Sequence, residues 1–248
     1  MNLHEEVFLR LKQGFANAEQ GTDNLLNSAL RLLCKWRAAL VQNTFKKNSD
    51  TVVLGGLFEG LDLLDGSSEG CHVPKILGCY EQPLHREFRR LMKNNYDILI
   101  NIGCAEGYYA VGFARLLHEI QIYAFDIDDN AQKKCKQLAA KNGVGSRVFV
   151  EGEFTHADLK KYASSRVLIL CDIEGAENDL LDPGKAPDLK STDIIVEVHE
   201  LMQPGLLEVL TKRFERTHYI KLVEDDGQRQ LCAMPKWFKT WSHLDQLL

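Results

Sequence analysis

Acidic side chains and a histidine follow two apolar runs in the second half of the chain. Asp172, Glu174 and Glu177 lie at or just beyond the end of the run at 167–172, and Glu197 and His199 lie at the end of the run at 193–198. If both runs are parallel strands of one sheet, their carboxyl ends meet at one edge, where open α/β sheets bind ligands. An acid inside an apolar strand, as Glu197 is, is costly to desolvate unless it is paired. These residues therefore indicate a reactive site.

Two kinds of chemistry fit these side chains. His199, oriented by an acid, could accept a proton from a hydroxyl group as a general base. Alternatively, Asp172, Glu197 and His199 could hold a divalent metal ion that lowers the pKa of that hydroxyl, and this ligand set suits Mg²⁺ or Mn²⁺ at least as well as Zn²⁺. We predict Asp172, Glu174 and His199 as catalytic residues and leave the metal open.

A second signal is the turn Gly103-Cys104-Ala105-Glu106-Gly107 between an apolar run and a helical pattern. A strand that turns through small residues into a helix brings backbone N–H groups close to a ligand at the helix N-terminus. The pattern is G-x-A-x-G. The bulky Tyr108 stands where a dinucleotide-binding turn needs close backbone approach, which disfavours a nicotinamide cofactor.

The end of the next predicted strand carries another candidate ligand. Asp126 lies 23 residues after Gly103, and an acid at this position accepts hydrogen bonds from ribose hydroxyls in nucleotide-type α/β sites. Asp128 and Asp129 begin the next predicted helix and are interpreted as capping residues. Glu153 and Phe154 follow the third predicted strand, and we expect them to border an adenine ring.

The elements that must position these residues alternate regularly from residue 96 onward. Predicted strands are 98–102, 121–126, 147–151, 167–172 and 193–198, and predicted helices are 107–119, 129–142, 156–163, 176–181 and 204–214. Such alternation predicts a doubly wound α/β fold with a mostly parallel sheet. Runs at 217–223 and 229–234, joined by a polar turn with Asp226-Gly227, predict an antiparallel C-terminal hairpin.

The motifs NIGCAEGYYAVGFA, YAFDID, CDIEGAE and VEVHE, in this order, resemble the FkbM-type family of class I S-adenosylmethionine (SAM)-dependent methyltransferases. The resemblance covers about residues 96–202. It implies a seven-stranded sheet closed by the antiparallel hairpin, SAM as the cofactor, and Tyr80 and Glu81 near that cofactor. Asn101 replaces the acid of the family's first motif. The predicted cofactor residues are Tyr80, Glu81, Asn101, Gly103, Cys104, Ala105, Gly107, Tyr108, Asp126, Ile127, Glu153, Phe154 and Asp172.

The chain of 248 residues divides into three predicted segments. Residues 1–47 predict a helical hairpin, 48–95 a glycine-rich lead-in with a helix, and 96–248 the SAM-binding domain. The hairpin could cover the site, pair two chains as a homodimer, or simply pack onto the domain. It lies outside the resemblance.

Composition narrows the classes of partner and compartment. The net charge of −5 and the absence of long basic blocks argue against a large nucleic-acid footprint. Seven scattered cysteines and no apolar stretch long enough to cross a membrane favour a cytoplasmic protein with reduced thiols.

We therefore expect an O-methyltransferase that acts on a small-molecule or glycan-like acceptor. The alternatives are a catalytically inactive SAM-binding scaffold and a nicotinamide-dependent oxidoreductase.

Overall fold

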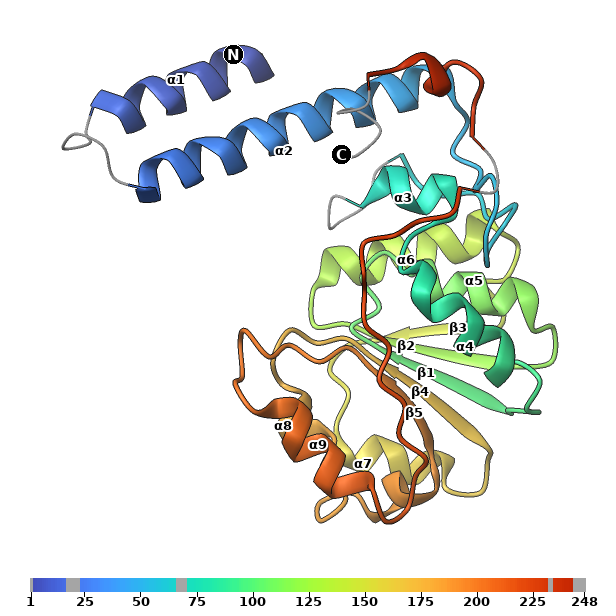
Figure 1. Ribbon diagram of the computed structural model, residues 1–248. Helices are drawn as coiled ribbons and strands as arrows, with labels where there is room; N and C mark the ends of the chain where they lie inside the picture. The colour runs from blue at the N-terminus through green and yellow to red at the C-terminus, as the bar shows by residue number, and fades with distance from the viewer. Residues whose placement is uncertain (1, 17–22, 66–70, 232–233, 243–248) are drawn as a thin grey trace. The chain divides into compact units, whose positions relative to one another are not determined.

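The computed structural model describes residues 2–16, 23–65, 71–231 and 234–242 (Figure 1). The chain forms two compact units. The helical unit comprises residues 1–51 and 233–248, and the sheet unit comprises residues 52–232. Most of the predicted lead-in segment 48–95, from residue 52 onward, belongs to the sheet unit.

The sheet consists of five parallel strands, β1 (Ile98–Ile102), β2 (Gln121–Phe125), β3 (Val148–Glu151), β4 (Val167–Cys171) and β5 (Asp193–Val196). Their order is β3-β2-β1-β4-β5. This Rossmann-like arrangement confirms the predicted doubly wound α/β class. Because the chain winds outward in both directions from β1 and β4, a crevice is expected at their carboxyl ends.

Helices cover both faces of the sheet (Figure 1). One layer contains α4 (His85–Leu91), α5 (Tyr108–Leu116) and α6 (Asp129–Lys141); the other contains α7 (His156–Leu159), α8 (Glu177–Leu180) and α9 (Leu206–Phe214). Ile98, Ile100 and Ile102 of β1 belong to the buried cluster that includes residues of α7 and α9. Alternation along the strand turns Leu99 and Asn101 to the opposite face, toward the α4–α6 layer.

Short elements lead into this sheet. Val52 and Asp62 form an antiparallel bridge, and α3 (His72–Leu77) follows. The 3₁₀-helix η1 (Gln82–Leu84) runs directly into α4, and two more such turns, η2 (Lys160–Tyr162) and η3 (Pro187–Ser191), lie between later strands.

The predicted antiparallel hairpin is wrong for the residues that the structure describes. The turn forms, because Asp225 and Asp226 accept hydrogen bonds from the backbone N–H groups of Gly227 and Gln228 at 2.9 Å. The flanking runs, however, form no strand between 217 and 231. The side chain of Gln82 instead donates a hydrogen bond to the backbone oxygen of Gln230 and accepts one from its N–H. These backbone groups therefore pair with a side chain and not with a neighbouring strand.

The helical unit contains α1 (Leu3–Ala16), α2 (Asp23–Asn48) and the turn η4 (Phe238–Thr240). Phe45 of α2 is fully buried against the rings of Trp237, Phe238 and Trp241, with ring centroids 4.8–6.3 Å away. Large apolar side chains of both helices are exposed, Phe8 and Leu26 by 69% and 61%. Pairing of two chains through these helices stays a prediction. No helix among the described residues is long and apolar enough to cross a membrane.

Candidate active site

The turn after β1 meets the end of β4 through its backbone. Gly103 has φ +76°, and a Cβ built on it would lie 1.6 Å from the backbone oxygen of Asp172. The Asp172 N–H in turn donates to the oxygen of Ile102 at 3.0 Å. Glycine is required at 103 because no side chain fits between the two strand ends. The glycine turn and Asp172 are thereby neighbours at one edge of the sheet.

The second glycine of the turn allows two helices to approach closely. Gly107 is the N-cap of α5 with φ +89°, and its Cβ would lie 2.6 Å from the sulfur of Cys135 on α6. Cys104 is also buried, and its hydrogen bond with Cys135, followed by burial, raises the pKa of its thiol. The side chain of Cys104 therefore packs between elements, and only its backbone borders the turn.

Asp126 connects the glycine turn to α6. Its two carboxylate oxygens accept hydrogen bonds from the backbone N–H groups of Ala105 at 2.8 Å and Asp128 at 2.9 Å. Asp128 caps α6 by accepting from Asn130, as predicted from the sequence. Each carboxylate oxygen of Asp126 keeps one further acceptor position. The neighbouring Ile127 is 83% exposed and presents an apolar side chain beside this carboxylate.

Two buried polar atoms near the turn have no hydrogen-bond partner among the described residues. They are Oδ1 of Asn101, which is 2% exposed, and the hydroxyl of Tyr108, which is 3% exposed. A buried polar group left without a partner costs about 1–3 kcal/mol. A ligand that donates a hydrogen bond to Asn101 would recover this free energy, so the orphaned oxygen fits a bound amino group.

A buried ion pair supports the turn from the other side. Lys75 of α3 and Glu106 of the turn are 3% and 4% exposed, and Nζ lies 2.6 Å from Oε1. The Lys75 ammonium also lies over the rings of Tyr80 and Tyr108, 4.7 and 5.3 Å from their centroids. Sequence reasoning missed both charged residues, because the 75–106 pairing has no local pattern.

The predicted Tyr80-Glu81 segment packs on the first turn of α5. Glu81 has φ +46° and accepts a hydrogen bond from the hydroxyl of Tyr109. Burial, followed by the charge of Glu81, raises the pKa of Tyr109, so this tyrosine stays a neutral donor. The Tyr80 and Tyr108 rings meet edge to face at 5.6 Å. The structure thus brings residues 80 and 81 together with the glycine turn.

The acidic residues after β4 and β5 surround His199. We call Asp172, Glu177, Glu197 and His199 the acid–histidine cluster. Nδ1 of His199 lies 2.7 Å from Oε1 of Glu177, and Nε2 lies 3.5 Å from Asp172 and 3.9 Å from Glu197. Glu177 is fully buried, so it fixes the imidazole. If Nδ1–H donates to Glu177, the lone pair is on Nε2 and faces Asp172 and Glu197.

This environment changes the acidity of the imidazole. Burial acts to lower the pKa of His199, but the hydrogen bond that His199 donates to Glu177 and the charges of Glu177, Glu197 and Asp172 outweigh it. The net effect raises the pKa above its usual value. The cluster therefore favours a histidine that binds a proton readily.

The same cluster has the geometry of a cation site. One ligand atom each from Asp172, Glu197 and His199 can be chosen so that all lie within 4.8 Å of one another. Two carboxylates and one imidazole are donors that divalent ions accept. Glu177 would then be the hydrogen-bond partner that orients the histidine ligand.

The remaining predicted residues lie at different depths. Glu174 follows β4 with φ +57°, a conformation uncommon for a residue with a side chain. Glu153 is exposed. Phe154 is buried against Phe125 with ring centroids 4.9 Å apart, so its ring contributes to the core.

No family model matches the sequence, and no curated protein matches it. Among solved structures, the chain is similar to an RNA methyltransferase from Salinibacter ruber in complex with S-adenosyl-L-homocysteine. The sequence identity is 18% and the TM-score is 0.33, and the match covers 44% of this chain and 71% of the other. It is also similar to the precorrin-6y C5,15-methyltransferase from Geobacter metallireducens. The sequence identity is 14% and the TM-score is 0.41, and the match covers 53% of this chain and 70% of the other.

The B. subtilis M1A22 tRNA methyltransferase TrmK is also similar, with a sequence identity of 20% and a TM-score of 0.40. The match covers 57% of this chain and 61% of the other. The similarity to these methyltransferases lies at the level of the α/β fold. The FkbM-type resemblance stays a prediction.

Proposed function

We propose that the protein is a SAM-dependent methyltransferase that methylates a hydroxyl oxygen of a small-molecule or glycan-like acceptor. The observation that carries the proposal is the position of Asp172. Its backbone touches Gly103 of the glycine turn, and its carboxylate lies 3.5 Å from His199. A nucleotide-type ligand at the turn and a base on the acceptor side would thus share one sheet edge.

The residues around the turn fit SAM by their chemistry. Asn101 Oδ1, buried and without a partner among the described residues, would accept from the amino group of the cofactor. The N–H groups at the start of α5 would bind its carboxylate. Asp126 would accept from the ribose, and the exposed Ile127 would pack against the adenine. Bound SAM supplies an activated methyl group.

His199 is proposed as the general base for the acceptor hydroxyl. The Glu177 bond directs the Nε2 lone pair away from the core, and the nearby carboxylates stabilise the imidazolium that forms. A positioned base contributes about 10²–10⁴ in rate. The alternative is a divalent ion held by Asp172, Glu197 and His199, which would lower the pKa of the acceptor hydroxyl. We propose the metal-free base first, and the chelation test below distinguishes the two.

Binding calorimetry with SAM and S-adenosylhomocysteine tests the cofactor half. We expect micromolar affinity, about −8 kcal/mol. Asp126→Asn should weaken binding by about 1.5–3 kcal/mol, because hydrogen bonds to a charged acceptor have this strength. Asp128→Asn is the matched control, since asparagine also caps helices well, and it should leave affinity unchanged. Tight NAD binding without SAM binding would instead favour the oxidoreductase.

Transfer of labelled methyl from SAM to panels of hydroxylated small molecules and glycans tests the catalytic half. His199→Ala should lower turnover by about 10²–10⁴ and keep SAM affinity within a few-fold. Glu177→Gln should also lower turnover and shift the pH profile, because its neutral amide no longer stabilises the imidazolium. SAM binding with no transfer to any acceptor would favour the inactive scaffold.

A further inference from the structure

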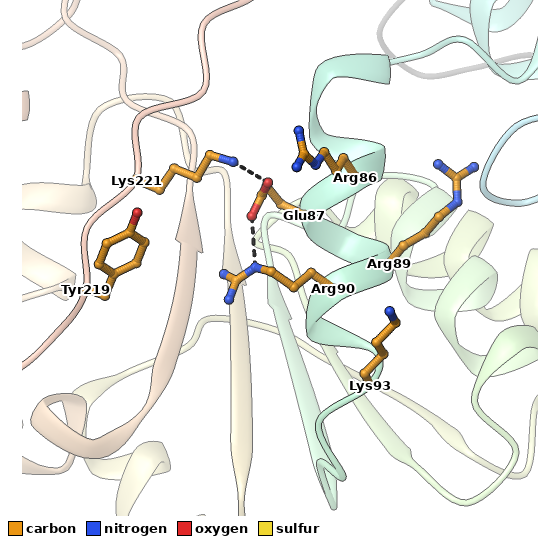
Figure 2. A pocket seen from close by; sticks show the side chains of 7 residues that line it. All are labelled: Arg86, Glu87, Arg89, Arg90, Lys93, Tyr219 and Lys221. Atoms are coloured by element: carbon orange, nitrogen blue, oxygen red, sulfur yellow. Dashed lines mark hydrogen bonds and ion pairs between the residues drawn. The ribbon is translucent and has the colours of Figure 1, made fainter.

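A groove with a cavity of about 600 Å³ runs along α4 in the sheet unit (Figure 2). Four basic residues of the α4 stretch, Arg86, Arg89, Arg90 and Lys93, line one side. Tyr219 and Lys221, from the segment after α9, line the other side. None of these residues belongs to the candidate active site. The groove therefore has its own chemistry.

The spacing of the α4 residues explains the row of positive charge. Positions 86, 89 and 90 follow i, i+3 and i+4, which places them on one face of α4, and Lys93 lies in the turn just after the helix. Phe88 and Leu91, on the other face, are buried. The three arginine side chains are therefore held toward solvent by the packing of the same helix, and Lys93 is exposed in the turn that follows it.

An internal carboxylate holds the two sides of the groove together. Glu87 forms ion pairs with Lys221 and with Arg90, the latter with Nε 3.0 Å from Oε2. The hydrogen bond from Lys221, together with Arg90, lowers the pKa of Glu87, so it stays ionised. One carboxylate thus fixes two cations at defined positions. The residues that line the groove therefore carry five positive charges against the one negative charge of Glu87.

The other basic residues remain available to a ligand. Arg86, Arg89 and Lys93 are exposed and form no ion pair with any residue that the structure describes. The chain as a whole has a net charge of −5 and no long basic block, and both features are the basis of the prediction against a large nucleic-acid footprint. The net charge is an average over the whole chain. A groove of this composition attracts anions locally whatever the average is.

The length of the row and one aromatic ring define the class of anion. Seven steps of about 1.5 Å from Arg86 to Lys93 give a row about 10 Å long, which suits several consecutive phosphates better than one. Tyr219 is 86% exposed beside these cations. An exposed ring next to a cationic track is the combination that stacks bases and binds backbone in single-strand recognition. We propose that this groove binds single-stranded nucleic acid, with phosphates on the α4 row and a base on Tyr219.

Fluorescence anisotropy of the full chain with a labelled twelve-nucleotide oligouridylate tests the proposal. With three to four phosphate contacts, log K should fall against log salt with a slope of about −2 to −3, because each contact in a single strand contributes about −0.7. Arg89→Gln and Lys93→Gln should each make the slope shallower by about 0.7. Lys136→Gln, an exposed lysine of α6, is the matched control and should leave it unchanged.

Tyr219→Ala separates stacking from charge. It should weaken binding by about 10-fold with the salt slope unchanged, since stacking carries no counterion release. The same oligonucleotide as DNA distinguishes the two kinds of strand, and both are expected to bind. Heparin and inorganic tripolyphosphate serve as charge-only probes. They should bind without responding to Tyr219→Ala.

Three results would overturn the inference. These are no binding at 50 mM salt, an equal loss in Lys136→Gln, or oligonucleotide affinity that ignores Tyr219→Ala and matches that of heparin. The last result would reassign the groove to sulfated or phosphorylated polyanions in general. The His199→Ala and Asp126→Asn variants should retain oligonucleotide binding. Failure of this proposal is thereby distinguished from failure of the methyltransferase proposal.

Discussion

Replacing Lys75 by methionine removes the cation from the buried pair beneath the glycine turn. Lys75 and Glu106 are almost completely buried, and Nζ lies 2.6 Å from Oε1. At an effective dielectric constant of about 20, two charges at this distance attract by about 6 kcal/mol. Desolvation of both groups offsets much of this attraction. The pair therefore contributes little net stability but makes each partner costly to remove alone.

Lys75→Met should lower the free energy of unfolding by about 3–5 kcal/mol, because it leaves the Glu106 carboxylate buried without its cation. The double variant Lys75→Met, Glu106→Leu removes both charges and should lie within about 2 kcal/mol of the wild type. Lys185→Met is the control. It breaks an ion pair with Asp179 whose side chains are 47% and 72% exposed, so it should cost less than about 1 kcal/mol.

Urea unfolding at pH 7, followed by far-ultraviolet circular dichroism, measures all three variants. If Lys75→Met does not fold, the double variant still tests the reasoning, because it should fold. A loss below about 1 kcal/mol for Lys75→Met would refute the reasoning, and so would a double variant less stable than the single one. Either result would mean that Glu106 does not depend on Lys75 for its burial.

Three further predictions address the turn and the acid–histidine cluster. Gly107→Ala should destabilise the fold by at least about 1–2 kcal/mol, because φ +89° is strained for alanine and its Cβ would meet Cys135; an unchanged melting temperature would contradict this. Since the folded-state pKa of His199 is raised, the stability it contributes is complete below about pH 6.5 and is lost as pH rises through the folded pKa. His199→Asn should flatten that part of the pH–stability curve, whereas base catalysis should increase over the same pH range. Chelation should leave methyl transfer unchanged if His199 acts alone, and activity restored by one divalent ion would assign the cluster to that ion.

The parallel sheet could be predicted because each of its strands carries a local signal. The apolar runs that form β1, β4 and β5 are bounded by polar residues or glycines, and the predicted and observed boundaries agree within two residues. Gly103 and Asp172 meet because parallel strands place their carboxyl ends at one edge. The sequence therefore predicts that Gly103 and Asp172 are neighbours, even though it does not predict their particular contact.

The hairpin and the supporting charges could not be predicted in the same way. Asp226-Gly227 does form a turn, but the backbone of Gln230 pairs with the side chain of Gln82, 148 residues away, and no local pattern predicts that contact. Lys75 and Glu106 lack a shared motif, and their burial depends on three-dimensional packing. Glu177 is recognisable in the sequence as an acid that follows the β4 run. Its position beside Nδ1 of His199 depends on the path of the chain between β4 and α8, which no local sequence pattern predicts.

The segment after α9 also has a consequence for the order in which the molecule folds. The paired strands join residues between 23 and 69 positions apart, as Ile98 does with Gln121 and with Val167. The segment after α9 is fixed by contacts between residues 134 and 148 positions apart. Closing longer loops costs more entropy, and distant contacts form late. We expect the sheet to assemble first and Lys221 and Gln230 to dock last. The same contacts can then open while the strands stay intact, so the Gln230 amide should exchange with solvent faster than that of Leu99, and the cationic groove should be the last part of the sheet unit to form.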